Sequence, residues 1–293
     1  MTRLLVHHRT AYTYADPVEL GAHVLHLRPR IVPYQTLHAF SLEIGPADPR
    51  LSQGQDHFDN PVTWLFLSGL HGSLTIESRA DVEVATRTPP GRTEAWERVA
   101  ARAIEDSAAE FVFASPRVPL LRQAHAWAAS SFPPGRPVLD GALDLMRRFA
   151  SEFTFDASAT TVSTSIARVL ELRAGVCQDF AHVMIAGLRT HGIPARYVSG
   201  YLRTVPPPGE ARLVGADQSH AWVGVWLGPD QGWVDLDPTN QIVVQDGHVV
   251  LGWGRDYSDV SPVRGVLLGG GKHTLAVSVD ITPAGALAAC RAG

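Results

Sequence analysis

The chain has 293 residues, which is longer than most single hydrophobic cores, so its length favours two domains. Its composition, 45% hydrophobic and 18% charged, is typical of a folded protein and excludes intrinsic disorder. The formal charge is −4 and no basic run could neutralise a row of phosphates, so we expect no nucleic-acid partner.

The sequence also argues against a membrane segment and a disulfide framework. Its first 17 residues lack the apolar core of a secretory signal, and no run of about 18 apolar residues occurs. We therefore expect a soluble, cytoplasmic protein without a membrane partner. Two cysteines, Cys177 and Cys290, are too few for a disulfide framework or a four-thiolate zinc site. Cys290, in a Gly- and Ala-rich tail, is interpreted as an idle thiol.

Residues 1 to about 87 alternate apolar and polar side chains in short segments, which Gly, Pro, Asp and Asn separate. This pattern predicts antiparallel strands, so we interpret residues 1–90 as an all-β, sandwich-like domain. The stretch TPPGR at 88–92 interrupts the pattern and a helical segment follows it. Residues 91–115 are therefore assigned to a helical connection.

Residues 116–293 are predicted to form a second domain. Helical patterns cover about 119–131, 139–152, 164–172 and 177–191, and Gly192 with Pro194 ends the last of them. A period of two then takes over and recurs up to HTLAVSVDI at 273–281. Helices followed by antiparallel strands indicate an α+β fold.

A cysteine stands at the predicted start of the helix 177–191. Gly175 ends the preceding segment, which places Cys177 in the first helical turn. Unpaired backbone N–H groups and the helix dipole favour a thiolate there and can hold an oxyanion. A small buried hydrophobic residue is the other interpretation of a free cysteine, and position alone leaves both open.

A cysteine nucleophile needs a base, and one of the 13 histidines stands out. In SHAWVGVW at 219–226, alternation puts His220 on a face with Trp222 and Trp226, opposite an aliphatic face. His220 is therefore the candidate base. A single histidine on a strand is more often structural, so the alternative stays open.

The segment WVDLD at 233–237 places Asp235 and Asp237 on one face. If it forms a hairpin with the His220 strand around residues 228–231, paired residue numbers sum to roughly 457 to 460. Asp237 then lies opposite residues 220–223. Pairing Asp235 with His220 would force Pro229 into the ladder, where it cannot donate a hydrogen bond. Asp237 is thus the predicted orienting carboxylate.

These residues resemble the transglutaminase-like superfamily of papain-like fold, in its bacterial branch with an extra N-terminal β domain. The resemblance rests on GVCQDFAHVMIAGLRTHGIPARYVSGYL at 175–202, SHAWVGVWL at 219–227, GWVDLDPTN at 232–240, GRDYSDVSPVRGV at 254–266 and PVELGAHVLHLRPR at 17–30. It implies a nucleophile at Cys177, a base at His220 and an acid at Asp237. It further implies acyl transfer through a thioester, from a glutamine-like or other amide of a protein or peptide. An amine acceptor would make the reaction transamidation, and water would make it hydrolysis.

Seven further residues are candidates for lining the cleft or supporting the oxyanion: Gln178, Asp179, Tyr201, Trp222, Asp235, Asp256 and Tyr257. For Gln178 and Asp179, a role in capping or bracing the helix start is the favoured interpretation. His182 and His191 are interpreted as structural or surface residues.

No metal or other cofactor is expected. His23 and His26 fall on opposite faces of a strand, which disfavours a metal site there, and no dense acidic loop suggests calcium. Two alternatives to an enzyme of this kind are kept. Cys177, His220 and Asp237 could bind zinc, or the fold could be a non-catalytic binding or scaffolding module.

Overall fold

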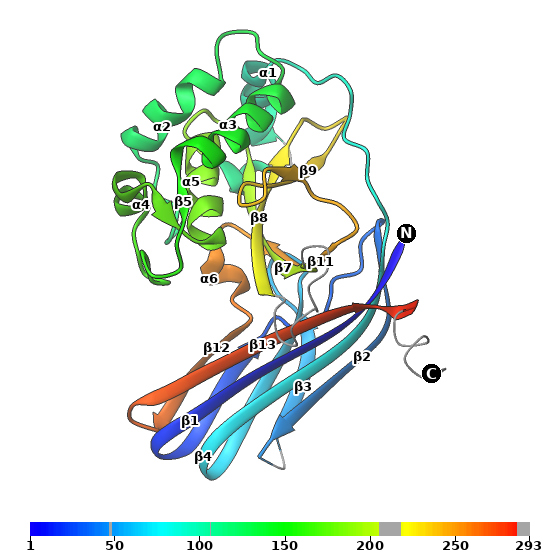
Figure 1. Cartoon of the computed structure of the whole chain (residues 1–293), viewed down its shortest axis with the longest axis vertical. Helices are drawn as coiled ribbons and strands as arrows, with labels where there is room; N and C mark the ends of the chain where they lie inside the picture. Colours follow the sequence, from blue (N-terminus) through cyan, green and yellow to red (C-terminus); the bar gives the residue numbers. More distant parts are fainter. Residues whose placement is uncertain (47–48, 106, 205–217, 286–293) are drawn as a thin grey trace, which may run out of the picture.

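The computed structural model describes residues 1–46, 49–105, 107–204 and 218–285. Two sheets organise them (Figure 1). A six-stranded antiparallel sheet forms the lower part of the picture, and a five-stranded antiparallel sheet lies above it with the helices gathered on one side. None of the helices in these ranges is long and apolar enough to cross a membrane. The α+β fold class predicted from the sequence is confirmed.

The six-stranded sheet is built on two strands of 24 residues each. Its members are β1 (Thr2–Leu25), β2 (Gln35–Gly45), β3 (Arg50–Gln55), β4 (Pro61–Val84), β12 (Val263–Gly269) and β13 (His273–Pro283). β1 pairs with β4 along its length, with an irregularity between Thr13 and Val18. The outer neighbours of the long strands change at this break. Before it, β1 pairs with β13, and the matching part of β4 pairs with β2. After it, β1 pairs with β12, and the matching part of β4 pairs with β3.

The two halves of this sheet enclose one apolar core. Leu74 and Ile76, from the half that carries β2 and β13, pack with Leu25, Leu65 and Leu67 from the other half. The expected sandwich-like domain is therefore present. Most of its alternating segments, however, are parts of the two long strands β1 and β4, because the turn residues inside these strands bend them without ending them.

β12 and β13 correct the assignment of their residues to the second domain. β13 pairs with β1 from Leu4 opposite Pro283 to Tyr14 opposite His273, so both strands belong to the N-terminal sheet. Their alternation shows that they are strands, but it carries no information about their partner. The chain thus leaves the sandwich after β4 and returns to complete it.

The second unit contains the helices and the five-stranded sheet. The helices are α1 (Trp96–Arg102), α2 (Arg122–Ala128), α3 (Val138–Glu152), α4 (Ile166–Leu172), α5 (Cys177–Arg189) and α6 (Tyr257–Val260), with 3-10 turns at Ala103–Glu105, Ala109–Val112 and Ala129–Ser131. The sheet has the order β10 (Ile242–Val243), β9 (Trp233–Asp237), β8 (Gln218–Trp226), β7 (Ala195–Leu202) and β11 (His248–Gly254). The short strands β5 (Thr154–Phe155) and β6 (Ala174–Gly175) pair in parallel, and β6 directly precedes α5 in the sequence.

Helix α5 is the centre of this unit. Its side chains from Asp179 to Arg189 are all buried, and it packs against β8, β7 and α2. A helix that is buried on every side has little freedom to move. Gly192, with φ of +76°, ends this region in a conformation that glycine adopts without strain. The packing of α5 therefore fixes the place of its first residue, Cys177.

The two units share a buried interface. Val279 and Ile281 of β13 pack with Tyr201, Val249 and Leu251 from the second sheet. The side-chain amide of Gln35 binds the backbone of the edge strand β11. Gln35 Oε1 accepts from Val250 N at 2.7 Å, and Gln35 Nε2 donates to Val250 O at 2.8 Å. These contacts satisfy backbone groups that an open sheet edge would leave exposed.

Candidate active site

Cys177 is the first residue of α5 and is partly exposed. The helix start is held by Asp179, which accepts hydrogen bonds from Val176 N at 2.9 Å and Thr160 Oγ1 at 2.6 Å. Asp179 is therefore a helix cap. Gln178 braces the same turn through Val162 O at 3.3 Å and also lines the cleft.

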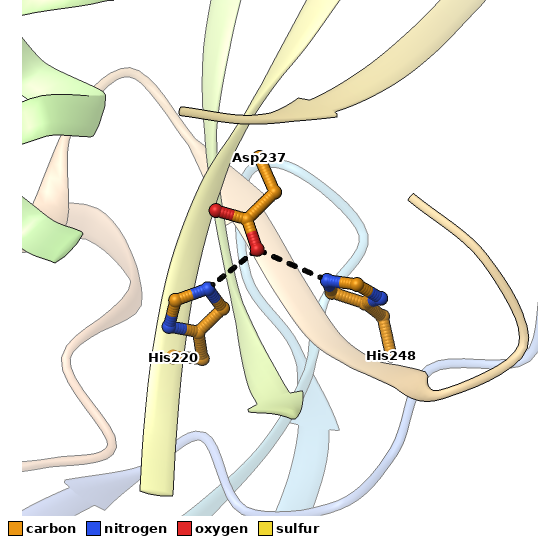
Figure 2. Close-up of side chains that lie close together, drawn as sticks. All are labelled: His220, Asp237 and His248. Atoms are coloured by element: carbon orange, nitrogen blue, oxygen red, sulfur yellow. Dashed lines mark hydrogen bonds and ion pairs between the residues drawn. The ribbon is translucent and has the colours of Figure 1, made fainter. Parts of the chain in front are cut away.

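His220 on β8 lies between Cys177 and Asp237. Its Nε2 is 2.8 Å from Asp237 Oδ2 (Figure 2), and it lines the same cleft as Cys177, whose side chain contributes to raising the pKa of His220. Because Asp237 occupies Nε2, Nδ1 is the nitrogen left for Cys177. The hairpin places these partners as the sequence predicts, since observed pairs such as Val223 with Leu236 sum to 459.

The charges of this pair are set by their contacts. Burial lowers the pKa of His220, but the hydrogen bonds with Asp237 and Cys177 outweigh it and raise that pKa to about 10. Burial raises the pKa of Asp237, yet hydrogen bonds from His220 and His248 hold it well below its usual range. An imidazolium next to a carboxylate is thus the stable state at neutral pH.

Asp237 has a second histidine partner that the sequence analysis missed. His248, at the start of β11, places Nε2 3.2 Å from Asp237 Oδ2, so the carboxylate lies between two imidazoles (Figure 2). Nothing in the spacing of HVVLGWG signals this contact, because it depends on how the chain returns after β9. Trp222 is fully buried and packs against both rings.

His220, Asp237 and His248 form the one group of metal-capable side chains with ligand atoms close together in the described part of the chain. Direct hydrogen bonds account for this closeness. Cys177 does not belong to this group of three. The group therefore differs from the set of Cys177, His220 and Asp237 that the sequence analysis considered as a zinc site.

A cleft of about 330 Å³ opens at Cys177, between the second unit and the N-terminal sheet. Cys177 and His220 line it, and Tyr257 lines it as the sequence analysis expected. Tyr257 is itself anchored, because its backbone N–H donates to Nε2 of the buried His182. Burial lowers the pKa of His182 to about 4, which keeps this ring a neutral acceptor and agrees with a structural role.

Four of the expected cleft residues lie beneath its surface and are corrected accordingly. Tyr201 is buried, with its hydroxyl 2.8 Å from His8 Nδ1. Asp256 is buried and caps α6 through Ser258 N. Trp222 is buried behind His220, as described above. The fourth, Asp235, is considered next.

Asp235 is 1% exposed and pairs with two arginines. Its Oδ2 lies 2.9 Å from Arg87 Nη2, and its Oδ1 lies 3.9 Å from Arg196 Nη2. Its charge is therefore compensated by these arginines and not by His220. Alternation along β9 put both aspartates on one face, but the arginines that capture Asp235 come from distant segments that no local pattern reveals.

Comparisons with known proteins agree with this architecture. Residues 125–238 match the transglutaminase-like superfamily, and residues 4–83 match the bacterial transglutaminase-like N-terminal region. The uncharacterized protein Rv2569c of Mycobacterium tuberculosis is 38% identical over 292 residues, covering 96% of this chain and 93% of that protein. The chain therefore belongs to the transglutaminase-like superfamily and carries its bacterial N-terminal region.

Two further relatives carry functional names. A protein-glutamine gamma-glutamyltransferase of Pseudomonas aeruginosa is 38% identical over 102 residues, which are 33% of this chain and 15% of that protein. The crystal structure of a protein from Cytophaga hutchinsonii, named as a candidate cysteine protease, aligns with a TM-score of 0.75 and 19% identity. The alignment covers 97% of this chain and 91% of the Cytophaga protein's chain. This last likeness shows that the whole two-unit fold recurs.

Proposed function

We propose that this protein is an enzyme that transfers an acyl group from an amide through a thioester on Cys177. The observation that carries the proposal is that Cys177 and His220 line one open cleft, with His220 hydrogen-bonded to the buried Asp237 and with its pKa raised by both neighbours. An imidazolium held by a buried carboxylate stabilises a neighbouring thiolate, which is the nucleophilic form of cysteine.

The reaction follows from this arrangement. The Cys177 thiolate attacks the amide carbon, and the carbonyl oxygen takes the negative charge near the N–H groups that begin α5. His220 gives its proton to the departing nitrogen, so the C–N bond breaks and a thioester and an amine result. His220 then takes a proton from the incoming water or amine, which attacks the thioester and restores the thiolate.

The amide class is also part of the proposal. The name of the Pseudomonas relative supports a glutamine side chain as donor, and that of the Cytophaga protein supports a peptide bond. Both are amides of a peptide or protein, and both reactions pass through the same thioester. The nucleophile that ends the reaction distinguishes transamidation from hydrolysis.

A peptide library incubated with and without a labelled primary amine, and analysed by mass spectrometry, tests the proposal. Amine-labelled peptides would indicate transamidation, and shortened or deamidated peptides would indicate hydrolysis. The control is Cys177→Ser, which we predict to stay folded and to lose several orders of magnitude in rate, because an alkoxide forms far less readily than a thiolate. Near-normal turnover by that variant, or no product from the wild type, would refute the proposal.

A further inference from the structure

Four side chains of the N-terminal sheet form a wall of the cleft opposite Cys177. Thr10 and Tyr12 come from β1, and Leu275 and Val277 come from β13. Thr10 is paired with Val277 and Tyr12 with Leu275, so the four stand side by side on one face of the two strands. We call this set the β1–β13 platform.

The β13 half of the platform is the uncovered end of a row that is otherwise buried, whereas Thr10 on β1 is itself buried. Val279, on the same face of β13, is 1% exposed because Tyr201, Val249 and Leu251 cover it. Leu275 and Val277 are 54% and 51% exposed, although they continue the same row. The second unit therefore stops covering this face where the cleft begins. An apolar surface left open beside a nucleophile is typical of a ligand-binding site.

His220 is the one protonated side chain among the described residues that line the cleft with the platform. No Asp, Glu, Lys or Arg occurs among the described residues that line the cleft. Beneath the platform, His8 hydrogen-bonds Thr10 Oγ1 at 2.9 Å and Tyr201 Oη at 2.8 Å. Burial lowers the pKa of His8 to about 4, so the ring is neutral at neutral pH. A cationic substrate group placed here would lose water and gain no partner among the described residues, and an anionic group would find only His220, which is already paired with Asp237.

We infer that the β1–β13 platform is a substrate subsite that binds an uncharged, apolar side chain next to the amide that Cys177 attacks. This inference rests on the proposed function and names its substrate class. The occupant follows from continuity with the cleft, because the platform and Cys177 line the same hollow. Strands from both ends of the chain thus determine which peptides reach the nucleophile.

Alkylation of Cys177 by peptide reagents tests the subsite. The probes are the chloromethyl ketones of acetyl-Leu-Leu-Gly, acetyl-Glu-Glu-Gly and acetyl-Lys-Lys-Gly, with iodoacetamide as a reagent that needs no subsite. Mass spectrometry identifies the labelled residue. We expect the Leu-Leu reagent to label Cys177 at least about tenfold faster than either charged reagent. A rate ratio of this size corresponds to the free energy gained when one apolar side chain is buried.

The variant Leu275→Gln/Val277→Thr keeps the side-chain volumes and adds no charge. We expect its labelling by the Leu-Leu reagent to fall about tenfold while iodoacetamide labelling is unchanged. The matched control is Val266→Thr/Leu268→Gln on β12, where both residues are also exposed, at 71% and 58%, but lie outside the cleft. This control should behave as the wild type does.

Equal labelling by the three peptide reagents, or a preference that survives in the Leu275→Gln/Val277→Thr variant, would overturn the inference. Failure of the proposed function gives a different result. In that case the apolar preference in labelling persists, but no peptide yields an acyl-transfer product with water or with an amine.

Discussion

Asp237 is the side chain on which the hydrogen bonds of the site converge. His220, His248 and Asn240 Nδ2 donate to its Oδ2, and the backbone N–H groups of Thr239 and Asn240 donate to its Oδ1. A carboxylate with this many donors stays ionised and keeps one orientation. It can therefore hold the His220 ring in a single tautomer.

Asp237→Ala and Asp235→Ala should differ in how strongly they lower activity. Asp237→Ala frees the His220 ring and removes the charge that favours its protonated form, so the acyl-transfer rate should fall by roughly 10² to 10⁴. Asp235→Ala should change the rate only a few-fold. It leaves the buried Arg196 without its partner carboxylate, so it should lower the free energy of unfolding by about 3–5 kcal/mol.

The pH dependence of Cys177 alkylation, together with urea unfolding, distinguishes the two variants. The midpoint of alkylation should move to higher pH in Asp237→Ala only, because the thiolate there loses its protonated partner. If the midpoint moves in Asp235→Ala and stays in Asp237→Ala, the orienting carboxylate has been assigned to the wrong residue.

The raised pKa of His220 predicts how stability depends on pH. Its ordinary value is 6.5 and its value in the folded chain is about 10, so the folded state binds the proton more tightly. The stabilisation is then complete below pH 6.5 and is lost as the pH rises to about 10. We expect the difference in unfolding free energy between wild type and His220→Gln to shrink over that interval. A difference that does not change between pH 6 and pH 10 would show that the ring is not protonated in the folded protein.

At the scale of elements, the sequence predicts contacts that are local or nearly so. The turn at 228–231 is enough to set the register of β8 and β9, and so to select Asp237 over Asp235. Gly192 and Pro194 similarly indicate where α5 ends. The partner of β13 could not be predicted, because β1 lies more than 200 residues away in the sequence. The contact of His248 with Asp237 could not be predicted either, because it depends on how the chain returns after β9.

The start of α5 gives a prediction at this scale. Asp179→Ala removes the acceptor for Val176 N and Thr160 Oγ1 in a site where Asp179 is almost fully buried. Loss of the cap and of these bonds should cost about 1–3 kcal/mol in thermal or urea unfolding. Activity should fall with it, because the cap positions the turn that carries Cys177. Asp140→Ala on the exposed side of α3 is the control and should change neither quantity. An Asp179→Ala protein of wild-type stability would contradict the assigned cap.

At the scale of the whole molecule, the N-terminal sheet and the second unit share strands and a buried interface. β1 is the partner of both C-terminal strands, and the side chain of Gln35 completes the edge of β11. The cleft wall opposite Cys177 belongs to the sheet as well. A division of the chain near residue 90 therefore separates its sequence patterns but cuts through its packing.

A chain that begins near residue 90 should consequently lose its activity on peptide substrates. Without β1, strands β12 and β13 have no partner, and Tyr201, Val249 and Leu251 become exposed to water. We expect such a chain to aggregate or to unfold at markedly lower urea concentration, as gel filtration and circular dichroism would show. Removing residues 263–293 as well should restore solubility only in part, because the apolar face of the second sheet stays uncovered. Full activity on peptides in either shortened chain would mean that the N-terminal sheet has no part in substrate binding, and would leave the second unit as a complete enzyme.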